Sequence, residues 1–233
     1  MTALGILYPG HFAEDDYPRI EQLLGGDIRV DLVHTDPGED GTPQQLTAGV
    51  DELRLAGTET VVWASVTGSS GYGWDGAHDQ VRSLARLAGT PASSTSLAFV
   101  NALREIEAGR VSVGVTCPPE EATLFTDFLR AGGVTVTGLR SAGPVSAAEA
   151  AGWGEEQVLA LARAADEPDA QAVVLPDTAL HTAAFVPLLE KAVGKPVLTA
   201  SQVTVWEALR LTDRRVNAPE LGALFTRQPI VQV

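Results

Sequence analysis

The side chains of Asp177 and His181 suit acid–base chemistry. Asp177 follows the apolar run Ala172 to Leu175 and precedes a helical pattern, so it could act as an acid, a base or a nucleophile at a strand end. The same position also suits an N-cap, whose side chain accepts hydrogen bonds from the first N–H groups of a helix. His181 comes four residues later and would share the helix face of Asp177, where an Asp–His pair can relay a proton.

The loop from Ser65 to Gly73 is rich in glycine and hydroxyl side chains. Backbone N–H groups exposed in such a loop can hold an oxyanion or a carboxylate. Its glycines stand at 68, 71 and 73, which fits neither the dinucleotide-binding fingerprint nor the phosphate-binding P-loop. The alternative interpretation is a flexible turn before a helix. The residues expected to meet a small acidic ligand are Ser65, Val66, Thr67, Gly68 and Ser69.

Two more predicted strand ends carry candidate binding residues. Pro9 and His11 follow the first strand, where His11 could face a cleft or sit on a surface loop. Cys117 stands at another strand end, before Pro118, where a thiolate would be useful. Cys117 has no obvious basic neighbour, so a small buried side chain is the alternative. Thr178 is the last candidate binding residue, because its backbone N–H follows Asp177 at a predicted strand end.

Short apolar runs alternate with longer helical patterns along the chain. This alternation is typical of βαβ units around a parallel sheet, and continuous apolar strands suit a sheet covered on both faces. Ligands of such sheets bind beyond the carboxyl ends of the strands, so we expect the candidate residues to converge on one cleft. Strands are predicted at 3–8, 28–34, 60–64, 111–115, 134–137, 172–175 and 196–199, and helices at 17–24, 44–55, 77–87, 97–106, 120–130, 147–165, 179–193 and 203–211.

The two halves of the chain resemble each other. The similar segments begin at Leu4 and Val113, at Val61 and Val173, and at Pro91 and Pro196, so they lie 109, 112 and 105 positions apart. We therefore expect an α/β fold of two pseudo-symmetric Rossmann-like lobes with parallel sheets and an interlobe cleft. The first lobe would span 1–108, joined by 206–233, and the second 109–205. The alternative is that any two Rossmann-like segments look alike.

Composition excludes several classes of protein. Sixteen Lys and Arg against thirty Asp and Glu give a net charge of −14, so nucleic acid and anionic membranes would repel the chain. One cysteine cannot form an internal disulfide, and four histidines share no zinc-like spacing. No basic region precedes the first apolar run, and no run approaches a membrane span of roughly 18 residues. We expect a soluble, cytoplasmic, metal-independent protein.

Several motifs together resemble the aspartate/glutamate racemase superfamily, specifically its maleate isomerase and arylmalonate decarboxylase branch. Their order and spacing run through nearly the whole chain. They are Gly5-Ile6-Leu7-Tyr8-Pro9, Ala64 to Ser69, Ser94 to Ala98, Val115 to Glu121, Leu175 to Thr182, and Pro196 to Gln202 with Trp206 and Leu209-Arg210.

The resemblance implies two lobes that work without cofactor or metal, often as a homodimer, on a small carboxylate ligand. Racemases and isomerases of this kind place a cysteine at each of two matching strand ends, and decarboxylases keep only the second. Here the two positions match Ser65 and Asp177. An unassisted serine hydroxyl is a far poorer nucleophile than a thiolate, so the usual cysteine mechanism is not expected.

Three functions remain open. The first is an isomerase or decarboxylase in which Asp177, supported by His181 or His11, replaces the thiol, while hydroxyls of the first loop and the Thr178 amide bind carboxylate. The second is a non-catalytic protein that binds small carboxylates. The third is a hydrolase or lyase that uses Asp177 with His181 or His11.

Overall fold

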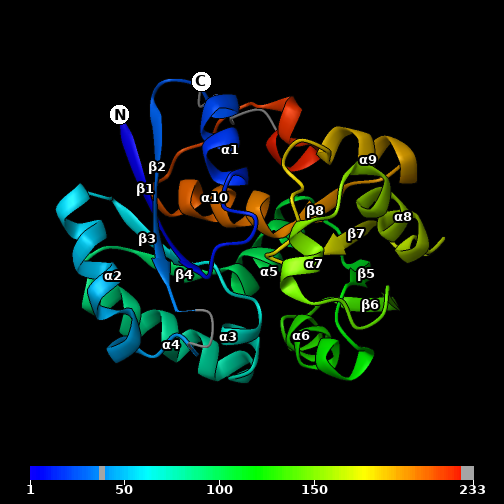
Figure 1. The fold of residues 1–233 in the computed structure, drawn as a ribbon, viewed down its shortest axis with the longest axis horizontal. Helices are drawn as coiled ribbons and strands as arrows, with labels where there is room; N and C mark the ends of the chain where they lie inside the picture. The colour runs from blue at the N-terminus through cyan, green and yellow to red at the C-terminus, as the bar shows by residue number, and fades with distance from the viewer. Residues whose placement is uncertain (37–39, 227–233) are drawn as a thin grey trace.

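The computed structural model describes residues 1–36 and 40–226. It confirms the predicted α/β class, with two four-stranded sheets whose paired strands are all parallel. The strand orders are β2-β1-β3-β4 and β6-β5-β7-β8, so both sheets repeat one topology. Figure 1 shows the two lobes side by side, with the first sheet, which includes the blue strands β1 and β2, at the left and the second, which includes the green strand β5, at the right.

Strands of the first sheet are β1 Thr2–Pro9, β2 Ile28–Thr35, β3 Thr60–Trp63 and β4 Ala92–Ser94. Those of the second are β5 Arg110–Val115, β6 Thr135–Ser141, β7 Ala172–Leu175 and β8 Val197–Thr199. The apolar strands β3 and β7 are buried along their whole length, as expected for strands covered on both faces. β6 alternates between exposed and half-buried residues because it lies at a sheet edge. The short strand β4 was not predicted.

Helices cover the sheets and join the lobes. In the first half they are α1 Asp16–Leu24, α2 Pro43–Ala56, α3 Thr67–Ser70, α4 Gly73–Ala88 and α5 Thr95–Glu105. In the second half they are α6 Pro119–Ala131, α7 Ala147–Ala151, α8 Glu155–Ala165, α9 Val186–Val193 and α10 Ala200–Leu211, followed by short 3-10 turns at Pro219–Leu221 and Ala223–Phe225.

Two helix predictions need correction. The helix predicted over 147–165 is two helices, because the glycines at 152 and 154 interrupt it. The helix predicted over 179–193 begins only at Val186, and residues 178–185 form a non-helical segment after β7. This second correction changes the surroundings of Asp177.

The paired helices α5 and α10 hold the lobes together. They contact each other, and α10 also contacts α1, β3 and β4 of the first lobe. Buried hydroxyls of Thr95 and Thr204 lie 2.6 Å apart between the two helices, and the buried Glu207 carboxylate accepts hydrogen bonds from Ser93 and Asn101. The main core cluster includes Leu4 and Val113, so one continuous core spans both lobes. Residues 227–233 of the predicted C-terminal extension lie outside the described residues.

Within residues 1–36 and 40–226, no helix is both long and apolar enough to cross a bilayer.

Candidate active site

A cavity of about 320 Å³ opens between the two lobes at the carboxyl ends of their strands. It is lined from the first lobe by residues that follow β1 and β3, and from the second by residues that follow β5 and β7. Ser65 and Asp177 both line it, as the pseudo-symmetric fold predicts. The lining residues are Pro9, Phe12, Ser65, Val66, Thr67, Ser70, Val115, Thr116, Cys117, Glu121, Ala122, Leu124, Phe125, Val145, Ala147, Pro176, Asp177, Thr178 and Ala179.

Ser65 is buried just beyond the end of β3. Its Oγ accepts a hydrogen bond of 3.0 Å from the backbone N–H of Gly68. A Cβ at position 68 would lie 2.8 Å from the Ser65 Oγ and 3.1 Å from the Trp63 Nε1, so glycine permits this close approach. Gly68 therefore shapes the site without lining the cavity. Because its Oγ already accepts one bond, the Ser65 hydroxyl can donate to a ligand.

Buried hydrogen bonds hold the first loop from beneath. Ser69 is fully buried, and its hydroxyl lies 2.7 Å from that of Ser94. Ser96 donates to the carbonyl of Val66, and Gln80 donates to that of Gly68. The structure therefore corrects the placement of Ser69, which supports the loop and does not face the cavity. The loop is also not a flexible turn, since its residues 67–70 form the short helix α3.

Asp177 lies half-buried after β7 with both carboxylate oxygens engaged. The Thr116 hydroxyl donates to its Oδ2, and the Ala179 N–H donates to its Oδ1 over 2.8 Å. No helix begins here, so the predicted N-cap role is wrong. The bond to Ala179 instead forms a local turn in which an aspartate side chain accepts from the backbone two residues later. These two bonds fix the orientation of the carboxylate of this lining residue.

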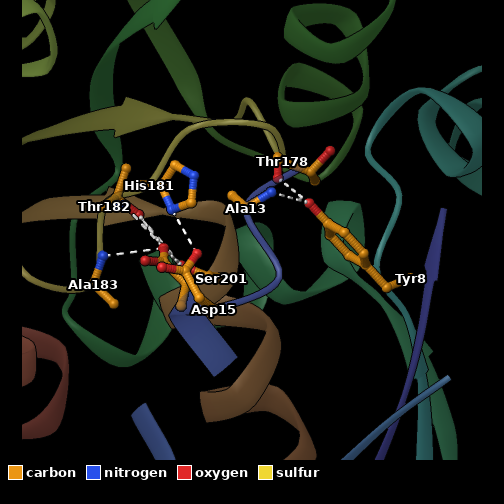
Figure 2. Close-up of polar contacts among 9 residues, drawn as sticks. Tyr8, Ala13, Asp15, Thr178, His181, Thr182, Ala183 and Ser201 are labelled. Carbon is orange, nitrogen blue, oxygen red and sulfur yellow. Dashed lines mark hydrogen bonds and ion pairs between the residues drawn. The ribbon is translucent and has the colours of Figure 1, made fainter. Parts of the chain in front are cut away.

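His181 does not share a helix face with Asp177. It lies in the non-helical segment after β7, and its Nδ1 is 2.7 Å from the Asp15 Oδ1 (Figure 2). It does not line the cavity, so the predicted Asp177–His181 pair is wrong on geometry. The periodicity argument failed because the helix was predicted to begin at residue 179, seven residues before its observed start at Val186.

Asp16 forms the main polar contact between the first lobe and the segment after β7. Its Oδ2 accepts hydrogen bonds from the N–H groups of Thr182 and Ala183, at 2.9 and 3.1 Å, and from the hydroxyls of Thr182 and Ser201, at 3.3 and 2.7 Å. Asp16 is only 3% exposed. Burial raises the pKa of its carboxyl above the ordinary value, although these hydrogen bonds pull the pKa down. We call Asp16, Thr182, Ala183 and Ser201 the interlobe clamp.

Tyr8 reinforces the same contact nearer the cavity. Its buried hydroxyl donates to the carbonyl of Thr178 over 2.8 Å and accepts from the N–H of Ala13 over 3.0 Å (Figure 2). Burial keeps the pKa of this phenol far above its ordinary range, so it remains a neutral donor at physiological pH. Through Tyr8, the first lobe thus binds the carbonyl of Thr178, the residue that follows Asp177.

Cys117 lines the cavity, but its surroundings do not favour a thiolate. Burial, followed by the negative charges of Glu121 and Asp177, raises the pKa of its thiol. A thiol attacks carbon as the thiolate, so this cysteine is poorly activated. The predicted alternative of a small buried side chain fits these surroundings better, although Cys117 is only partly buried.

Two further predicted binding residues lie away from the cavity lining. His11 is exposed, and its Nδ1 is 3.2 Å from the Glu14 Oε2. Pro118 is the residue that precedes helix α6, and it directs that helix without lining the cavity. An arrangement of Asp177 with His11 is therefore not formed. Pro9, Val66, Thr67 and Thr178 line the cavity as predicted.

Several lining residues were not predicted. Thr116 stands one position before Cys117, at a strand end that the sequence already indicated, and Ser70 belongs to the first loop. Phe12, Phe125 and Val145 are apolar lining residues, and no short motif predicts them because they come from three separate segments.

The cavity holds anionic groups and neutral donors. Among the described residues that line it, none is Lys, Arg or His, whereas Glu121 and Asp177 carry carboxylates. The backbone N–H groups of Thr67 and Thr178 have no acceptor within the described chain. Unpaired N–H groups and hydroxyls at a cavity wall can bind a carboxylate without a cation.

Fold and cavity together define a two-lobed α/β protein with its site between the lobes. A family model described as arylmalonate decarboxylase matches residues 33–225. The chain therefore belongs to the arylmalonate decarboxylase family. It is 29% identical over 140 residues to the arylmalonate decarboxylase of Bordetella bronchiseptica, an alignment that covers 59% of this chain and 58% of that enzyme, less than two thirds of its length.

Solved structures share the fold over almost the full chain. The maleate cis-trans isomerase of Nocardia farcinica matches with a TM-score of 0.87 and 22% identity, covering 97% of this chain and 98% of that one. The maleate isomerase Iso of Pseudomonas putida S16 matches with a TM-score of 0.85 and 18% identity, covering 97% and 98%. A variant of the Nocardia enzyme carries a covalently bound succinylcysteine intermediate.

Proposed function

We propose that this protein is a cofactor-independent enzyme of the decarboxylase or isomerase type that acts on a small carboxylic acid, with Asp177 where the relatives use a thiol. The observation that carries the proposal is that Ser65 and Asp177 line one cavity from opposite lobes. Membership of the arylmalonate decarboxylase family and the similarity to maleate isomerases support the reaction type.

The first loop is the proposed carboxylate site. The hydroxyls of Ser65, Thr67 and Ser70 and the unpaired N–H groups of Thr67 and Thr178 would donate to a substrate carboxylate. The apolar lining residues Phe12, Phe125 and Val145 would contact the hydrocarbon part of the substrate.

Asp177 is the proposed proton donor. When a carboxyl group leaves as CO2, its bonding electron pair stays on the α-carbon, and the proton of Asp177 would move to that carbon. This step requires that Asp177 carries a proton when the substrate is bound. Water would then return a proton to the Asp177 carboxylate.

A covalent route through a thiol has less support in this chain. The succinylcysteine intermediate of the Nocardia isomerase requires a nucleophilic cysteine. Here the single cysteine has a raised pKa, and none of the described residues that line the cavity with Ser65 is a histidine that could act as its base. Proton transfer by Asp177 is therefore the better-supported chemistry.

The test is turnover of phenylmalonate and of maleate, followed by proton NMR in deuterated water. Decarboxylation would place deuterium on the α-carbon of the product, and isomerisation would give fumarate from maleate. We expect Asp177→Asn to lower kcat by about 100-fold or more, the usual contribution of a general acid or base, while ligand-induced thermal stabilisation is retained. Asp127→Asn removes an exposed carboxylate of α6 and serves as the control. Full activity of Asp177→Asn would refute the proposed role.

Non-catalytic carboxylate binding is the second candidate, and one observation favours it. Both oxygens of Asp177 already accept hydrogen bonds, one of them in a local turn, as expected of a structural aspartate. A binding protein would be stabilised by phenylmalonate or maleate, would form no product from either, and would keep this behaviour in Asp177→Asn.

A further inference from the structure

Three side chains with metal-binding atoms gather outside the cavity, at the carboxyl ends of β1 and β2. His11 and Glu14 follow β1, and His34 belongs to β2. One ligand atom from each lies within 4.8 Å of the other two. The Glu14 Oε2 is 3.2 Å from the His11 Nδ1 and 3.5 Å from the His34 Nε2. Two ligands of a tetrahedral zinc ion, each about 2.05 Å from it, lie about 3.3 Å apart, so these spacings suit a shared ion.

The hydrogen bond of His34 leaves its second ring nitrogen directed at Glu14. Its Nδ1 is 2.8 Å from the carbonyl oxygen of Gly10, which can only accept, so Nδ1 carries a proton. The other ring nitrogen, Nε2, faces the Glu14 carboxylate at 3.5 Å. A metal ion between these two atoms would bind both of them. The same bond from a ring N–H to a backbone carbonyl orients histidines that bind metals.

His11 is free to complete the site. Its side chain is 68% exposed, and its ring stacks on that of His34 with centroids 3.9 Å apart and an angle of 28° between planes. Nearly parallel rings cannot both direct a lone pair at one ion. Because the His11 side chain is exposed, its ring can rotate until its lone pair points at the ion. Its Nδ1 already lies beside the Glu14 carboxylate.

We propose that His11, Glu14 and His34 form a binding site for a divalent transition-metal ion such as Zn2+, with water in the remaining position. Two imidazoles and one carboxylate suit zinc, nickel or copper, whereas magnesium and calcium prefer oxygen ligands. The spacing of these histidines in the sequence gave no sign of the site, because β2 brings His34 beside a loop that lies far from it in the chain.

Metal binding would act on the cavity through the loop that carries its ligands. Between His11 and Glu14 lie Phe12, which lines the cavity, and Ala13, whose N–H donates to the Tyr8 hydroxyl. An ion bound by His34 together with His11 and Glu14 would link the loop that carries His11 and Glu14 to β2. The site is thus expected to stiffen one wall of the cavity, independently of the reaction that the cavity supports.

The test uses tag-free protein treated with a chelator and then titrated with Co2+, whose visible absorption reports its ligands, and with Zn2+ by calorimetry. We expect one ion per chain. His34→Ala and Glu14→Gln should each weaken Zn2+ binding by at least about tenfold, because even outer-shell changes cost about 10- to 100-fold. The control is His78→Ala, which removes a histidine of α4 that bonds to the Trp74 carbonyl and lies outside the cluster.

A thermal melt separates loss of the site from loss of the fold. Without metal, the variants should melt as the wild type does, and Zn2+ should raise the Tm of the wild type and of His78→Ala only. The proposal is overturned if the wild-type protein takes up no Co2+ or Zn2+. It is equally overturned if His34→Ala and Glu14→Gln bind Zn2+ as tightly as the wild type.

Discussion

Replacing Asp16 tests how the first lobe positions the segment after β7. In Asp16→Ala, the N–H groups of Thr182 and Ala183 lose their acceptor in a buried place. Each unsatisfied buried donor costs about 1–3 kcal/mol. The hydroxyls of Thr182 and Ser201 lie 3.3 Å apart and can bond to each other, so they add little.

The loss of a buried charge offsets part of this cost. We therefore expect Asp16→Ala to lower the free energy of unfolding by about 3 kcal/mol. For a chain of this length, that corresponds to a fall in Tm of roughly 6–12 °C. Asp16→Asn keeps an oxygen acceptor and removes the charge, so we expect a loss of about 1 kcal/mol or less.

The pH dependence gives the sharper test. Burial raises the pKa of Asp16 above its ordinary value of 3.8, so between that value and the folded-state pKa the native protein holds a proton that the unfolded chain releases. The stability that Asp16 contributes is therefore greatest below the unfolded-state pKa and is lost as the pH rises through the folded-state pKa. Asp16→Asn has no carboxyl group at this position, so its stability lacks this pH dependence.

Urea denaturation of the wild type and of Asp16→Asn at several pH values measures the difference. The advantage of the wild type over Asp16→Asn should shrink as the pH rises above about 4. An advantage that grows with pH would mean that the ionised carboxylate is favoured in the folded protein, which would refute the account of the clamp. Equal stability of Asp16→Ala and the wild type would refute the expected loss of about 3 kcal/mol from the hydrogen bonds that Asp16 accepts.

Two further predictions concern the cavity walls. Gly68→Ala would bring a Cβ to 2.8 Å from the Ser65 Oγ, so we expect urea denaturation to show a free energy of unfolding lower by about 1–3 kcal/mol. The control Gly26→Ala, which has open space around its Cβ, should change little. Equal stabilities of the two variants would contradict the close approach. Cys117 should react slowly with iodoacetamide at pH 7 and faster only as the pH rises. Asp177→Asn should lower the pKa of the Cys117 thiol and speed its reaction at pH 7. Rapid alkylation of the wild type at pH 7 would show that the thiol is activated after all.

The fold could be predicted because its signals are local and repeated. The apolar runs at β1, β3, β5 and β7 mark buried parallel strands, and the similarity of the two halves places Ser65 and Asp177 on matching strand ends. The cavity follows from that symmetry. Helix boundaries were less predictable, since residues 179–185 have helix-compatible types but bond to Asp16 of the other lobe.

The roles of the polar residues depended on contacts that no local pattern encodes. Ser69 looked like its neighbours Thr67 and Ser70, yet Ser94 turns it away from the cavity. His181 looked like a partner of Asp177, yet Asp15 lies beside it. Both partners come from elements that the sequence placed correctly, but their side-chain contacts depend on how the elements pack.

The position of Asp177 is set by both lobes. The Thr116 hydroxyl and the Ala179 N–H orient its carboxylate from within the second lobe. Tyr8 holds the carbonyl of the next residue, and Asp16 holds the segment four residues further on, both from the first lobe. Any movement of one lobe against the other must therefore break buried hydrogen bonds before it displaces this carboxylate. A proton donor held in this way needs no lid to orient it, because the energy that joins the lobes already fixes its geometry.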